Sequence, residues 1–112
     1  MMLRFTTTAQ ADAVTLAVSG QINASNASEF RRAITEALDH GTRLVIDLTA
    51  VDLLGSAGVS VLYDYVDRQP QLVIRSGSVI ARVLTIAGLD GYLSVQTARR
   101  IPSGVGGSRA EV

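Results

Sequence analysis

Two short and nearly continuous apolar runs, at residues 44–48 and 72–74, constrain the fold of this chain most strongly. Such runs are typical of strands that are buried on both faces, as in a parallel sheet. Parallel neighbours need a crossover connection, which is usually a helix. Stretches with helical spacing of apolar residues precede, separate and follow the two runs. The sequence therefore predicts alternating strands and helices in right-handed βαβ units.

Other patterns predict further strands. Residues 14–18 alternate between apolar and small or polar side chains, which indicates a strand with one buried face, and Gly20 is expected to end it. Residues 4–8 are rich in threonine and predict an earlier strand, while residues 93–95 predict a short last one.

Three stretches predict helices, because apolar residues recur in them with helical spacing. Capping and stop residues set their expected ends. The predicted helices are residues 26–40 with Asn26 as N-cap, Glu29 in the first turn and Gly41 as stop, residues 56 to about 68 before Pro70, and residues 78–87 with a Ser76-Gly77-Ser78 cap and Gly88 as stop.

The expected fold class is therefore α/β, with one domain, a mostly parallel sheet of four to five strands and three main helices. The length of 112 residues allows one domain. We expect this domain to span residues 1–98. Residues 99–112 are rich in Gly, Ser and Arg and are expected to form a flexible tail.

The composition excludes several classes of function. Ten basic and ten acidic residues give a formal net charge of zero, so a nucleic-acid partner is not expected. The chain has no cysteine and one histidine, His40, so neither a metal site nor a cofactor is expected. It contains no phosphate-binding loop and no Gly-x-Ser-x-Gly nucleophile elbow, and the protein is expected not to be an enzyme.

The sequence also predicts where the protein works. No apolar segment approaches the 20 or so residues that span a bilayer, so no membrane span is expected. Residues 1–10 contain no apolar core of a signal peptide. Together with the absence of cysteine, these features predict a cytoplasmic protein.

The connection after the run at residues 44–48 is the most informative segment. A short loop delivers Ser56 to the start of a helix, and Gly55 and Gly58 allow backbone or a partner to approach closely. The free N–H groups of a helix start favour negative charge, so a phosphate on Ser56 would be tolerated there. It would add about −1.5 to −2 charges to any docking surface. The alternative is that Ser56 is an ordinary N-cap on a solvated face.

Helical spacing extends this segment. Ser56, Ser60, Asp64 and Asp67 are spaced by four, four and three residues and are predicted to form one polar stripe, in which Asp64 can pair with Arg68. Three polar residues after the second strand are expected beside Ser56, because the ends of parallel strands meet at one sheet edge. They are Gln21, Asn23 and Ser25, with a simple turn before the helix as the alternative.

Four further side chains have structural interpretations. Asp47 is expected to accept backbone hydrogen bonds in the loop that follows it, and Asp52 is expected to be a turn residue. Tyr63 and Tyr65 are expected to be half-buried rather than hot spots for a partner.

Three motifs, in order, resemble those of STAS domains, specifically the bacterial anti-sigma-factor antagonists. The resemblance covers about residues 3–97, and no motif is specific alone. The motifs are Gly20-Gln21-Ile22-Asn23, the segment Asp47-Leu48-Thr49 through Val51-Asp52-Leu53-Leu54 to Gly55-Ser56-Ala57-Gly58, and the late helix Val79-Ile80-Ala81-Arg82-Val83-Leu84 with its Gly88-Leu89 exit.

The resemblance implies a binding protein without catalysis of its own. Its partner would be an anti-sigma factor that is also a serine kinase of the histidine-kinase-like ATPase fold, and capturing this kinase releases a sigma factor. Phosphorylation of Ser56 would end the capture, and a phosphatase would reset it. Together with the helical stripe and the placement of the loop after the second strand, we expect the partner contacts to be Gly55, Ser56, Ala57, Gly58, Ser60, Asp64, Gln21, Asn23 and Ser25.

The chain departs from the family pattern at three positions. Gly55, Gln21 and Asn23 stand where the family carries acidic residues. Their loss either weakens kinase recognition or lowers the electrostatic cost of a phosphate. The alternative function is therefore a STAS adaptor without a switch, as in stressosomes or lipid-transport ATPases.

Overall fold

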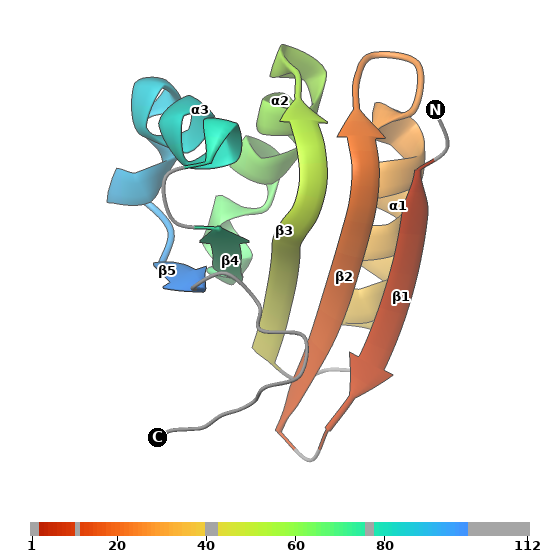
Figure 1. Ribbon diagram of the computed structural model, residues 1–112. Coiled ribbons are helices and arrows are strands. Elements are labelled where there is room, and N and C mark those ends of the chain that lie inside the picture. Colours follow the sequence, from red (N-terminus) through yellow and green to blue (C-terminus); the bar gives the residue numbers. More distant parts are fainter. Residues whose placement is uncertain (1–2, 11, 40–42, 76–77, 99–112) are drawn as a thin grey trace, which may run out of the picture.

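The computed structural model describes residues 3–10, 12–39, 43–75 and 78–98. Five strands and three α-helices alternate after an initial hairpin (Figure 1). The strands are β1 (Arg4–Ala9), β2 (Ala13–Ile22), β3 (Arg43–Leu54), β4 (Gln71–Arg75) and β5 (Val95–Ala98). The helices are α1 (Ala27–Leu38), α2 (Ser56–Asp64) and α3 (Val79–Ala87), with short 3₁₀ turns η1 (Val66–Arg68) and η2 (Leu89–Gly91).

The strands form one sheet in the order β1-β2-β3-β4-β5. The β1–β2 pair is antiparallel, and the other three pairs are parallel. Helix α1 lies behind β1 and β2 in Figure 1. The predicted α/β class with a mostly parallel sheet and three main helices is confirmed.

The hydrophobic core lies on one face of the sheet. In β2, Val14, Leu16 and Val18 are buried, while the residues between them are only half-buried. The same alternation holds in the first half of β3 and in β4, so the prediction that these strands are buried on both faces is wrong. All three helices contribute to the single core cluster, with Phe30 and Ile34 fully buried from α1. The core therefore lies between one layer of helices and one face of the sheet.

Strands β2 and β3 run further than predicted. Gly20 does not end β2: it adopts φ 111° inside the strand, a conformation that suits glycine, and β2 continues to Ile22. The pairing with β3 shifts register twice, and each shift places an extra residue in β3. The bulges move the buried face of β3 from Leu48 to Val51 and then to Leu54. Asp52, predicted as a turn residue, is therefore an exposed strand residue.

Asp47 lies beside the first of these bulges. Its Oδ1 accepts hydrogen bonds from the Thr49 backbone N–H at 2.9 Å and from the Thr49 hydroxyl at 2.7 Å. Asp47 thus accepts a backbone hydrogen bond as predicted, but inside a bulged strand rather than in a loop.

The helix ends differ from prediction in detail. Asn26 is the N-cap residue of α1, but its side chain makes no capping bond. Helix α2 ends at Asp64 rather than near Arg68, because Tyr65 leaves the helical region at φ −111° and a 3₁₀ turn follows. The last strand begins at Val95 rather than residue 93.

Helix α3 has the predicted ends. The Ser78 hydroxyl accepts from the Ala81 N–H at 3.2 Å, and Gly88 ends the helix with φ 79°. Several predicted features lie outside the described residues: His40 with Gly41, the first part of the α3 cap at residues 76–77, and the tail at 99–112.

Candidate partner-binding site

Ser56 is the first residue of α2 and follows β3 after a single residue, Gly55. Its side chain is exposed. Gly55, with φ −80° and ψ 174°, is the N-cap, so the interpretation of Ser56 as an ordinary N-cap is wrong. The hydroxyl therefore stands at a helix start without serving as its cap.

Two glycines bring this helix start against the end of β2. The Gly55 N–H donates to the Ile22 carbonyl at 2.8 Å, and a Cβ at residue 55 would lie 3.3 Å from the same oxygen. A Cβ at Gly58 would lie 2.6 Å from both Ile22 Cγ2 and Leu54 Cδ1. The close approach that these glycines allow is thus within the chain, and Gly58 itself is buried.

The loop after β2 adjoins Ser56, as predicted. The Asn23 Cα would lie 3.7 Å from a Cβ on Gly55. Asn23 Oδ1 accepts from the Ser25 N–H at 3.0 Å and from the Ser25 hydroxyl at 2.6 Å. Gln21 and Asn23 are half-buried, whereas Ser25 is exposed. The structure thus brings the three polar residues to the sheet edge that carries Ser56.

The Asn26 side chain fixes this loop instead of capping α1. Its Oδ1 accepts from the Asn23 N–H at 2.8 Å, and its Nδ2 donates to the Gln21 carbonyl at 2.9 Å. The amide therefore spans the segment from the end of β2 to the start of α1.

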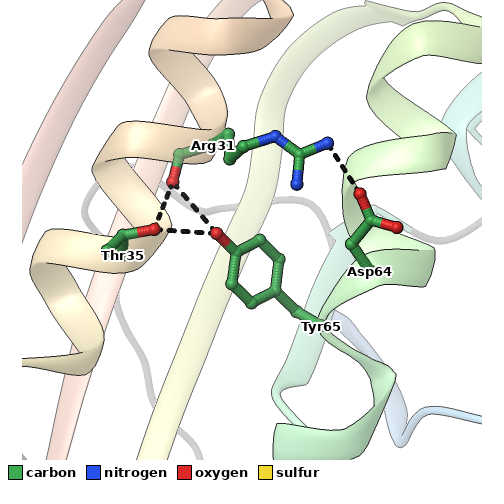
Figure 2. A network of polar contacts seen from close by, with 4 residues as sticks. All are labelled: Arg31, Thr35, Asp64 and Tyr65. Atoms are coloured by element: carbon green, nitrogen blue, oxygen red, sulfur yellow. Dashed lines mark hydrogen bonds and ion pairs between the residues drawn. The ribbon is translucent and has the colours of Figure 1, made fainter.

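The predicted polar stripe is exposed over α2 at Ser56, Ser60 and Asp64. It does not continue as a helix to Asp67, which lies in η1. Asp64 pairs with Arg31 of α1 rather than with Arg68, at 2.7 Å between Oδ2 and Nη2 (Figure 2). The Asp64 carboxylate raises the pKa of Arg31 above its ordinary value, because it stabilises the charged guanidinium.

A second contact beside this ion pair joins the same two elements. The Tyr65 hydroxyl lies 2.7 Å from the Thr35 hydroxyl and donates to the Arg31 carbonyl at 3.5 Å (Figure 2). Tyr65 is half-buried as predicted, while Tyr63 is more exposed and its hydroxyl donates to the Ala87 carbonyl. The contacts with Arg31 and Thr35 hold the C-terminal end of α2 against α1.

Sequence reasoning missed two apolar side chains at this sheet edge. Leu53 at the end of β3 is 44% exposed, and Val79 at the start of α3 is 61% exposed. Leu53 is exposed because it follows the second bulge, which turns the neighbouring Leu54 into the core. The signal for Leu53 was the pair Leu53-Leu54 itself, since successive strand residues point to opposite faces.

The described residues contain no group of three or more acidic or histidine side chains that could hold a metal ion. In the same part of the chain, no helix is both long and apolar enough to cross a membrane. What the edge around Ser56 offers chemically is an exposed hydroxyl, uncharged polar side chains and an exposed leucine.

The fold and motifs define a known class of domain. A family model described as "Mlab, STAS domain" matches residues 5–97, so the chain belongs to the STAS domain family. The family predicted from the sequence is confirmed. Several of the proteins that this chain resembles are anti-sigma factor antagonists.

One such relative is the anti-sigma-F factor antagonist RsfB of Mycobacterium tuberculosis. It is 34% identical over 102 residues, which cover 86% of this chain and 84% of RsfB. A crystal structure of an anti-sigma factor antagonist from Mycobacterium paratuberculosis matches with a TM-score of 0.77 and 25% identity, covering 85% of this chain and 86% of that one.

The structure of SpoIIAA, an anti-sigma factor antagonist in its unphosphorylated form, matches with a TM-score of 0.60. The match covers 85% of this chain and 89% of SpoIIAA, at 14% identity. At this identity the match concerns the fold alone.

Proposed function

We propose that this protein is an anti-sigma factor antagonist that captures an anti-sigma factor and so releases a sigma factor. The observation that carries the proposal is the exposed Ser56 on the first residue of α2, beside the polar loop after β2. The names of RsfB and of the M. paratuberculosis protein support the same function. The protein acts by binding and catalyses no reaction, and its work with the transcription machinery takes place in the cytoplasm.

The partner surface consists of the exposed and half-buried residues around the start of α2. Ser56 and Ser60 form its centre, and Asn23 and Ser25 form the neighbouring rim. Leu53 supplies exposed apolar area at the same edge, of the kind that anchors many interfaces. Gly55, Ala57 and Gly58 shape the backbone beneath, and Gln21 and Asp64 border the surface.

Phosphorylation of Ser56 by the captured serine kinase is the proposed switch. A phosphate would place about −1.5 to −2 charges at the centre of the surface. The helix start stabilises this charge within the free protein, because the Ser56 and Ala57 N–H groups precede the first intrahelical hydrogen bond, which the Gly58 N–H donates to the Gly55 carbonyl. A kinase surface that fits the neutral serine has lower affinity for the phosphorylated protein. The phosphorylated protein is therefore released, and it can bind again after a phosphatase removes the phosphate.

Mass spectrometry after incubation with the purified kinase and ATP tests the switch. We expect one phosphate on Ser56 and none on the Ser56→Ala variant. The matched control is Ser94→Ala, which removes an exposed hydroxyl at the opposite end of the sheet and should leave labelling unchanged. Label at another residue, or none with a kinase that is active on another substrate, would contradict the proposal.

Calorimetric titration of the kinase tests the capture separately. Ser56→Asp should weaken binding at least tenfold, while Ser56→Ala should bind as the parent does. Leu53→Ala should also weaken binding without changing the phosphorylation site. Equal affinity of all four chains would show that the kinase docks elsewhere.

The second candidate function is an adaptor without a switch. It is favoured by the uncharged residues Gly55, Gln21 and Asn23 at positions where the family carries acids. An adaptor would copurify from its native cells with a transporter ATPase or a stressosome assembly, whereas an antagonist would copurify with a lone ATPase-fold kinase.

A further inference from the structure

A cavity of about 220 Å³ lies at the N-terminal ends of the parallel strands, opposite to the end that carries Ser56. Arg43 and Gln71 are the first residues of β3 and β4, and Ser94 directly precedes β5. With Arg68 and Gln69 after α2, these residues line the cavity. Since Ser56 follows the other end of β3, the cavity lies apart from the proposed partner surface.

The lining of the cavity is cationic. Two of its described lining residues are arginines, Arg43 and Arg68, and none of them is acidic. Arg43 lies 4.0 Å from Asp12, at the limit of an ion pair, and both side chains are mostly exposed. Within the described residues Arg68 forms no ion pair. The described lining residues thus carry two positive charges and no negative charge, in a chain whose formal net charge is zero.

The backbone around the cavity is unusual at Gln69. With φ 51° and ψ 51°, Gln69 is the one described non-glycine residue with positive φ. Its N–H closes η1 on the Val66 carbonyl at 3.0 Å, and the following Pro70 disfavours the ordinary helical conformation. Glycine or asparagine adopts this conformation more easily. Glutamine instead adds a long amide to the lining of the cavity.

We propose that this cavity binds a phosphoryl group, as free phosphate or as the phosphomonoester of a small metabolite. Guanidinium groups match phosphate oxygens with paired hydrogen bonds, and two of them balance a dianion. The Gln69 amide and the Ser94 hydroxyl supply neutral donors beside them. The Gln71 side chain, which also belongs to the lining, donates a hydrogen bond of 2.5 Å from its Nε2 to Gln96 Oε1.

The test is an NMR titration of the whole chain with potassium phosphate, in which potassium chloride keeps the ionic strength constant. We expect saturable shifts of the backbone amides of Arg43, Gln69 and Ser94. O-phosphoserine as a second titrant distinguishes the sources: tighter binding than that of phosphate indicates a phosphomonoester, and weaker binding indicates free phosphate.

Variants separate binding from folding. The double variant Arg43→Gln/Arg68→Gln should weaken phosphate binding at least tenfold, whereas the double variant Arg75→Gln/Arg82→Gln, which removes the same two charges at the other end of β4 and in α3, should bind as the parent does. Gln69→Asn keeps a residue suited to positive φ but shortens the amide, so binding should weaken while the Tm does not fall. Shifts that do not saturate, or equal affinity in all variants, would overturn the proposal and leave only adventitious ion binding.

Discussion

Replacing Gly58 with alanine tests how closely α2 is packed against the sheet. Gly58 is buried in the first turn of α2. A Cβ there would lie 2.6 Å from the Ile22 Cγ2 and Leu54 Cδ1 methyl groups. Optimal carbon–carbon contacts are about 3.5–4.0 Å, so both neighbours would have to move by about 1 Å.

The expected loss of stability follows from two opposing effects. Overpacking a core costs about 1–3 kcal/mol, and the upper half applies because Ile22 is β-branched and fully buried. Alanine is favoured over glycine in a helix by about 1 kcal/mol. The net loss is about 1–2 kcal/mol, which lowers the Tm of a chain this size by about 4–8 °C for each kcal/mol.

Thermal and urea unfolding followed by circular dichroism measure this effect. Gly91→Ala is the matched control, because a Cβ at Gly91 meets nothing within 4 Å, and its Tm should stay within about 2 °C of the parent. Backbone amide shifts in the Gly58→Ala variant should concentrate at the ends of β2 and β3. A variant as stable as the parent would refute the reasoning, since it would mean that Ile22 and Leu54 can move aside without loss of folding free energy.

Three further experiments test the core, a cap and the contact between α1 and α2. Phe30→Ala removes a fully buried ring and should cost about 3–5 kcal/mol in urea unfolding; a loss under 1 kcal/mol would contradict its place in the core. Ser78→Ala should cost about 1 kcal/mol through the lost α3 cap, with Ser78→Asp retaining most of the stability. A double-mutant cycle on Arg31 and Asp64 should give a favourable coupling that falls as salt is raised, and a salt-independent coupling would argue against an exposed ion pair.

The sequence predicts the class of fold because the strong signals are local. The apolar runs and helical spacing lie within single elements, and the Ser78 and Gly88 ends of α3 depend on bonds within a few residues. The apolar run at residues 44–48 also suggests burial on both faces, but helices cover only one face. Whether helices also cover the other face of the sheet depends on the topology of the whole chain. Five residues of one strand contain no information about this topology.

The placement of Ser56 and its loop neighbours was predicted, but the contacts among the residues of the candidate site were not. Ser56 at a helix start and its neighbour Asn23 follow from the rule that parallel strands end at one edge. The length of β3 could not be predicted, because its two bulges break the period of two that marks a strand. The pairing of Asp64 with Arg31 joins two helices, and helical spacing offered only the nearer Arg68.

The order of the strands has a consequence for the emerging polypeptide. Each strand lies beside the one made just before it, from β1 through β5. A nascent chain leaving the ribosome can therefore pair every new strand with a strand that is already outside the exit tunnel. No strand has to stay unpaired until a distant segment of the chain is made. Synthesis in the N-to-C direction and growth of the sheet proceed in the same sequence, which keeps the open edge of the unfinished sheet short-lived.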